Sequence, residues 1–197
     1  MTTQIDLKQI ERRAWTMYFD DGLWEIFLGV LLIGMGVRTV TDNVWFTFLA
    51  LSSVLVWPLG KRLVTIPRVG LAKFGPARRA KQFKITVIIV VAVLATFALW
   101  IYAANSGVNL PDAASAAVVG GFITFIFWLL AYFLDFRRLY LYAPLFASTL
   151  ALSEVFEDPI PGYAALGAGG LILLIGALYL LRFMRRYPKP SLEESDA

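Results

Sequence analysis

The sequence contains no cysteine and no histidine among its 197 residues. These absences exclude disulfide bonds, thiol nucleophiles, zinc fingers, haem ligation by histidine and imidazole acid–base chemistry. Charged residues are scarce at 16%, whereas hydrophobic residues reach 59%. A soluble domain has about 45–50% apolar and about 25% charged residues. The composition therefore predicts an integral membrane protein of the all-α class, because backbone groups in lipid must be bonded within the segment.

Six apolar runs have lengths near the 17–25 residues that cross a hydrocarbon core about 30 Å thick. We predict six transmembrane helices, over residues 23–40, 44–59, 85–104, 113–134, 139–156 and 162–181. The second run is short, and the fifth reaches full length only if it includes Pro144 and Glu154. The sequence thus predicts a membrane domain over residues 23–181, followed by a largely disordered cytoplasmic tail over residues 182–197.

The positions of lysine and arginine predict the orientation. Of the 18 basic residues, all but Arg38 lie in the N-terminal segment, the loop 60–84, the link 135–138 or the C-terminal segment. Since lysine and arginine concentrate in cytoplasmic loops, both termini and the long loop are expected in the cytoplasm. The first apolar run is too long for a signal peptide and is expected to remain as an anchor. We expect a multi-pass protein of a prokaryotic cell (plasma) membrane.

The N-terminal segment over residues 1–22 precedes the first predicted span. Its apolar residues between Ile5 and Tyr18 fall near one helical face, with charged residues opposite. This pattern predicts an amphipathic helix that lies in the cytoplasmic membrane interface.

The cytoplasmic loop 60–84 carries eight basic residues and no acidic residue. Polybasic segments near an anionic leaflet gain about 1 kcal/mol per basic residue. We predict that this loop contacts anionic lipid headgroups or a protein partner; the alternative is that its charge only fixes the topology. Nucleic acid is not an expected partner, because no known module is present. The candidate contact residues are Arg68, Lys73, Arg78, Arg79, Lys81 and Lys84.

Glycines recur at heptad spacing in the first and last predicted spans. Gly29 and Gly36 lie on one helix face, and Gly169 and Gly176 on another. Small residues let membrane helices approach closely. We therefore expect the first and sixth helices to pack together, either within one bundle or between copies in a homo-oligomer.

Acidic residues are dense where the first span begins. Asp20 or Asp21 can cap the helix, and Glu25 lies one turn further on. The alternative is a carboxylate site for a metal such as Mg²⁺ or for a headgroup. At the outer end of the same helix, we expect Arg38 to form an ion pair with Glu154.

Three functions remain compatible with these features. The first is a non-enzymatic scaffold, accessory subunit or regulator whose basic cytoplasmic face binds anionic lipid or a protein partner. The second is a small oligomeric transporter or channel, which the polar residues of the fifth span favour. The third is a metal-dependent lipid-headgroup enzyme that uses Asp20, Asp21 and Glu25. We prefer the first, and expect neither a cofactor nor a catalytic residue.

Overall fold

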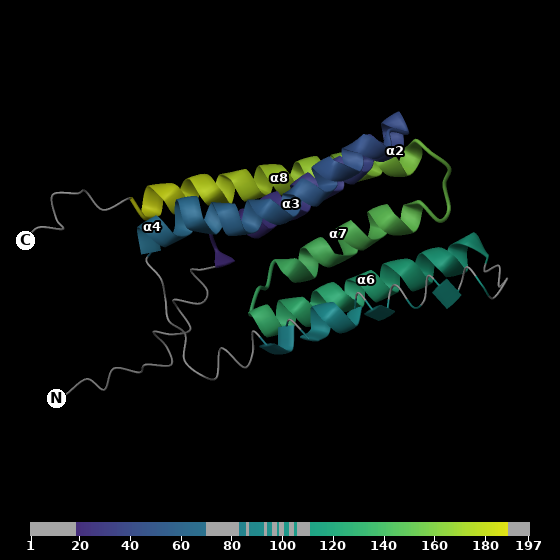
Figure 1. Cartoon of the computed structure of the whole chain (residues 1–197), viewed down its shortest axis with the longest axis horizontal. Helices are drawn as coiled ribbons and strands as arrows, with labels where there is room; N and C mark the ends of the chain where they lie inside the picture. The colour runs from purple at the N-terminus through teal and green to yellow at the C-terminus, as the bar shows by residue number, and fades with distance from the viewer. Residues whose placement is uncertain are drawn as a thin grey trace, which may run out of the picture. The chain divides into compact units, whose positions relative to one another are not determined.

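A computed structural model describes residues 19–69, 83–85, 87–92, 94–95, 98, 101–102, 105 and 111–188. These residues form helices and their connections, and no β-strand occurs among them (Figure 1). Helical residues occur between positions 83 and 105. The other elements, in chain order, are α2 (Leu23–Thr41), the 3-10 turn η1 (Val44–Phe46), α3 (Thr47–Gly60), the π-helical turn η2 (Lys61–Thr65), α4 (Ile66–Val69), α6 (Asp112–Leu134), α7 (Leu139–Leu152) and α8 (Ile160–Arg186).

Four helical segments are long and apolar enough to cross a membrane. They are Leu23–Thr41, Val44–Val69, Asp112–Leu134 and Ile160–Arg186. Two shorter apolar helices, Phe83–Ala92 and Leu139–Leu152, lie where the third and fifth spans are predicted. Part of the predicted span 85–104 lies outside the described residues. The chain is therefore all-helical in its described part, and four of its helices indicate a membrane protein.

Three helices end at residues other than those predicted. The second continues past Gly60 to Val69, because apolar residues go on alternating with the basic ones beyond that glycine. The fifth ends at Leu152, and a turn follows in which Phe156 N donates a hydrogen bond to Leu152 O at 2.9 Å. The sixth runs five residues beyond Leu181, into the predicted tail.

The described chain divides into two compact units. Residues 19–69 and 165–188 form the first, which we call the α2–α3–α8 unit. The described residues from 83 to 164 form the second, which we call the α6–α7 unit.

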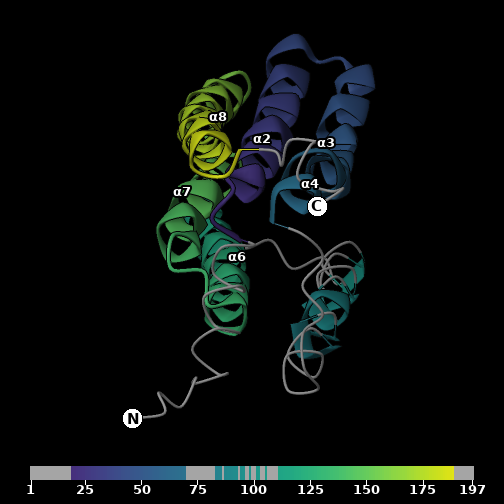
Figure 2. The same cartoon turned by 90° about the vertical axis from the view of Figure 1, so that its left-hand side faces the viewer.

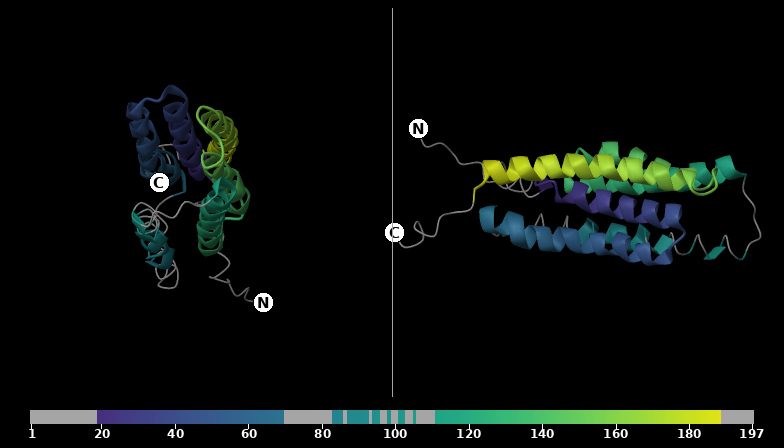
Figure 3. Two further views of the ribbon diagram at one scale, coloured as in Figure 1. Left: turned by 90° about the vertical axis from the view of Figure 1, so that its right-hand side faces the viewer. Right: turned by 90° about the horizontal axis from the view of Figure 1, so that it is seen from above.

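In the α2–α3–α8 unit, α2 lies between the other two helices (Figures 1 and 3). In the most apolar stretch of α2, 39% of the residues are buried. The corresponding share is 17% for the segment Val44–Val69, which contains α3. On the α3 side, a Cβ atom at Gly34 would lie 2.5 Å from the backbone nitrogen of Ala50. Both faces of α2 are therefore used for packing.

The contact between α2 and α8 depends on glycine. A Cβ atom at Gly29 would lie 2.8 Å from Leu173 Cβ, and one at Gly169 would lie 2.9 Å from Leu32 Cβ. A Cβ at Gly176 would lie 2.8 Å from the backbone nitrogen of Ile26. Three of the four predicted packing glycines thus lie at the interface of α2 and α8. The helices are so close there that a larger residue at any of the three positions would force them to move. The fourth, Gly36, is buried on α2.

The α6–α7 unit contains an antiparallel hairpin (Figure 2). Its turn uses Asp135 in the left-handed conformation (φ 55°), and Phe136 N donates a hydrogen bond to Ala131 O at 3.0 Å. The rings of Phe127 and Phe146 stack with centroids 5.1 Å apart. Aromatic stacking and apolar burial hold this hairpin.

Candidate functional site

A buried ion pair joins the start of α2 to the end of α3. Lys61 Nζ donates a hydrogen bond to Asp21 Oδ2, with an N–O distance of 2.7 Å. Thr65 Oγ1 donates a hydrogen bond to the same oxygen. The three residues are almost fully buried, with exposed fractions of 0% for Asp21, 3% for Lys61 and 1% for Thr65. One carboxylate oxygen therefore bridges an ammonium group and a hydroxyl group that lie four residues apart.

The other oxygen of Asp21 contacts the start of α2. Asp21 Oδ1 accepts a hydrogen bond from Leu23 N at 3.2 Å, which satisfies a donor at the helix end. Gly22 lies between them with φ +79°, in the left-handed region that glycine adopts most readily. The two oxygens of Asp21 thus connect one helix start to a second helix.

Lys61 and Thr65 are the first and last residues of the π-helical turn η2. Within this turn Ile66 N donates to Lys61 O, five residues back rather than four. Pro67 follows, has no N–H, and in a regular α-helix its ring would press on the carbonyl group of Leu63. We attribute the wider turn in part to this proline. Such turns are rare inside helices and are frequent at functional sites.

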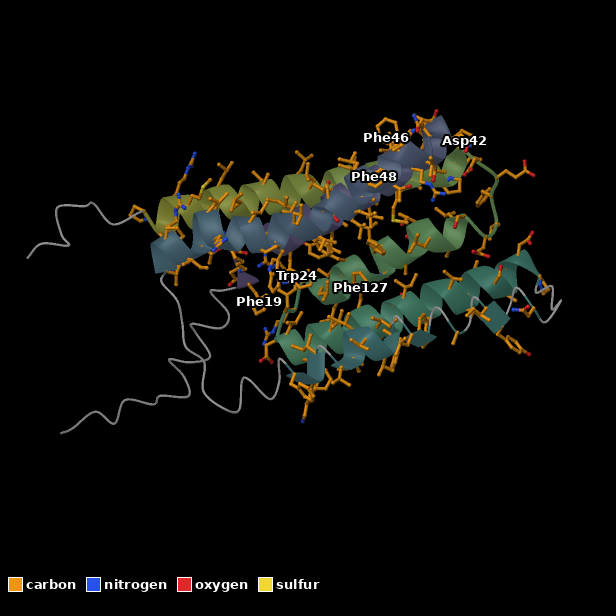
Figure 4. All side chains as sticks on the ribbon, viewed as in Figure 1. Phe19, Trp24, Asp42, Phe46, Phe48 and Phe127 are labelled. Carbon is orange, nitrogen blue, oxygen red and sulfur yellow. The ribbon has the colours of Figure 1, made fainter. Side chains whose placement is uncertain are left out.

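Two aromatic residues near the start of α2, Phe19 and Trp24, are labelled in Figure 4. Lys61 Nζ lies 5.5 Å from the ring centroid of Phe19, within the range of a cation–π interaction. Trp57, one turn before Lys61, lies 5.7 Å from the ring of Trp24 between centroids. Asp21 and Lys61 are both buried, and a buried pair is attracted more strongly than one at the surface.

The other two acidic residues of the predicted cluster have different positions. Glu25 is fully buried (0% exposed), and its Cβ would lie 2.7 Å from a Cβ at Gly176 on α8. Asp20 is exposed. Among the residues that the structure describes, no three His, Cys, Asp or Glu residues lie close enough together to hold a metal ion. Asp21, one of the three acidic residues, is hydrogen-bonded to Lys61 and Thr65.

The depth of the ion pair follows from its neighbours. A Cβ at Gly22 would meet Tyr179 and Leu180 of α8, and a Cβ at Gly60 would meet Leu23. The first basic residue of α8 is Arg182, two positions after Leu180. Asp21 and Lys61 therefore lie at the level where α8 changes from apolar to basic.

Five arginines belong to the segments at this end of the α2–α3–α8 unit, where both α4 and α8 end (Figures 1 and 3). Four are exposed and one, Arg68, is half-buried with its Nη1 donating to Val64 O at 3.0 Å. The ring of Tyr187 lies 5.1 Å from that of Phe183 and 6.0 Å from the Arg186 guanidinium. We call this surface the arginine-rich end; its residues are Arg62, Arg68, Arg182, Arg185 and Arg186.

The remaining predicted lipid or partner contacts are placed only in part. Lys84 is exposed and belongs to the α6–α7 unit. Four others, and the predicted amphipathic helix between Ile5 and Tyr18, lie outside the described residues. The four are Lys73, Arg78, Arg79 and Lys81.

Arg38 and Glu154 are both exposed. Arg38 lies in the last turn of α2, and Glu154 follows the end of α7. The two residues belong to different units, so their ion pair stays a prediction.

Sequence reasoning missed Lys61 and Thr65 as site residues. The sequence predicts Lys61 in the basic cytoplasmic loop 60–84, as one of its eight basic residues. A signal for the longer helix is present in the apolar residues Leu63, Val64 and Ile66 beyond it. A lysine inside an apolar helix requires a counterion, and an acid at the start of the preceding span is the nearest candidate.

Comparison with known proteins adds no relationship: no family model, no curated protein and no solved structure matches this chain.

Proposed function

We propose that this chain is a non-enzymatic protein of a prokaryotic cell membrane, a scaffold, accessory subunit or regulator that binds anionic phospholipid at its arginine-rich end. In this proposal the chain spans the membrane six times, with both termini and the arginine-rich end in the cytoplasm. The bias of lysine and arginine toward one side of the predicted topology supports this orientation.

The observation that carries the proposal is the level at which the arginines lie. From Ile160 to Leu181, α8 is apolar for 22 residues, about 33 Å at 1.5 Å per residue. That length matches a hydrocarbon core of about 30 Å. Arg182, Arg185 and Arg186 would then emerge among the headgroups, at the same end of the unit as the exposed Arg62. Guanidinium groups suit phosphate because they present a planar fork of donors.

A lipid fits this surface better than an acidic protein does. The arginines come from two helix ends that both leave the membrane at one level, where phosphate groups are always present. The half-buried Tyr187 lies next to Arg186, and tyrosine is typical of the membrane interface. The segment between residues 70 and 84 adds further basic residues to the same cytoplasmic side in the predicted topology.

The test is lipid retention by the purified full chain. Native mass spectrometry would count bound phosphatidylglycerol and phosphatidylcholine after extraction into a mild detergent. Replacing Arg182, Arg185 and Arg186 by Gln should weaken phosphatidylglycerol binding about 100-fold, at about 1 kcal/mol per arginine. Arg38→Gln, an exposed arginine at the opposite end of α2, is the matched control and should retain the lipid.

Equal lipid retention by the triple variant and the wild type would contradict the proposal. So would an equal loss in the Arg38 variant, because the effect would then report net charge. Co-purification of an acidic protein that the triple variant releases, without any change in bound lipid, would favour a protein partner instead.

A further inference from the structure

The bridging contact of Asp21 has a consequence for the shape of the second helix. Asp21 Oδ2 accepts hydrogen bonds from Lys61 and Thr65, which are the first and last residues of the π-helical turn. The Asp21 carboxylate therefore contacts both the first and the last residue of η2, the turn of this helix that contains an extra residue.

That extra residue determines the direction in which the following segment points. A π-helical turn closes through a bond to the fifth residue back, and an α-helical turn through a bond to the fourth. Converting one into the other rotates every later residue by the angle of one residue, about 100°. The residues that would rotate are Ile66–Val69, which include the arginine-rich end's Arg68.

We propose that Asp21 controls this rotation: while its carboxylate binds Lys61 and Thr65, the turn stays π-helical, and when that contact is lost the turn relaxes to α-helix. A change at the start of α2 would thus alter the direction of the Arg68 side chain, while α3 itself would keep its position. It concerns the conformation of the helix and does not depend on what the arginine-rich end binds.

Two structural facts support a specific role for Asp21. The neighbouring acid Asp20 is exposed, so the bridge belongs to one residue and not to the acidic segment as a whole. Pro67 disfavours the α-helical turn but does not forbid it, since Pro58 lies inside the α-helical part of the same helix; Asp21 acts on the turn across 40 residues of sequence. A contact that is distant in sequence can be made or broken by movement between helices, and a proline cannot.

The absence of cysteine permits a direct distance measurement. Spin labels on Val69→Cys and Arg185→Cys, both exposed and in the same unit, report the segment after the turn. Labels on Leu59→Cys and Arg185→Cys report the helix before it. Distances would be measured by pulsed electron paramagnetic resonance on the full chain in lipid nanodiscs, with and without Asp21→Asn.

Asp21→Asn should shift the 69–185 distance by several ångströms and leave the 59–185 distance unchanged. A rotation of about 100° moves a side-chain tip 5–6 Å from the helix axis by about 8 Å. Asp20→Asn is the matched control and should change neither distance.

Thr65→Val keeps the ion pair and removes one end of the bridge, so it tests the same idea in a less perturbed protein. It should give a mixed distribution for the 69–185 pair. An unchanged 69–185 distance in both variants would overturn the proposal. A parallel change in both label pairs would also overturn it, because α3 would then have moved as a whole.

Discussion

Two helical hairpins in the described part of this protein are held by different forces. The α6–α7 hairpin depends on stacked rings, with Phe127 against Phe146, and on apolar burial. The hairpin of α2 and α3 adds a buried ion pair between Asp21 and Lys61 at one end. Stacked rings tolerate small shifts between helices, whereas a hydrogen-bonded ion pair defines which residues must face each other. We therefore assign the more exact register, and the candidate site, to the hairpin with the ion pair.

The largest expected effect comes from Lys61→Met, which keeps most of the side-chain volume and leaves the Asp21 carboxylate buried without its cation. Breaking a buried pair by removing one partner costs about 3–5 kcal/mol. The free energy of unfolding in mixed detergent micelles should fall by about that amount.

Lys84→Met is the matched control, because Lys84 is exposed. Its cost should stay within about 0.5 kcal/mol, as for ordinary surface substitutions. Equal losses in the two variants would mean that the ion pair does not distinguish one hairpin from the other.

A smaller effect is expected at the contact between α2 and α8. Gly29→Ala would place a Cβ 2.8 Å from Leu173 Cβ, and overpacking of this kind costs about 1–3 kcal/mol. Gly170→Ala on α8 is the control, since nothing lies within 4 Å of the added atom. The same unfolding measurement should separate the two variants; a Gly29→Ala protein as stable as the control would argue against close packing of these helices.

The smallest expected effect is in the α6–α7 hairpin. Phe127→Leu keeps an apolar side chain but removes the stacking with Phe146, which is worth about 0.5–1.5 kcal/mol. Phe125→Leu, at an exposed position of the same helix, should cost less. If Phe127→Leu destabilised the protein as much as Lys61→Met, the difference between the hairpins would disappear.

The long apolar helices are predictable from the sequence because their length and composition are local properties. Runs beginning at Leu23, Ala113 and Gly162 predict α2, α6 and α8 to within a few residues. The heptad glycines also predict which faces can approach closely, because the absence of a side chain is visible in the sequence.

The end of the second helix is not predictable in the same way. The buried position of Lys61 depends on a counterion that Asp21 supplies from the start of another helix, 40 residues earlier. The apolar residues after Gly60 are visible in the local pattern, but the partner of Lys61 is not, so the sequence predicts Lys61 in the basic loop 60–84.

The most direct test of the account is a double-mutant cycle on the ion pair. It compares the free energies of unfolding of Asp21→Asn, Lys61→Met and the double variant. Each single change leaves one buried group without its partner. The free energy of unfolding of the double variant should therefore fall by at least about 1 kcal/mol less than the sum of the two single decreases. Losses that add to within about 0.5 kcal/mol would show that Asp21 and Lys61 do not act as a pair, and would contradict the account.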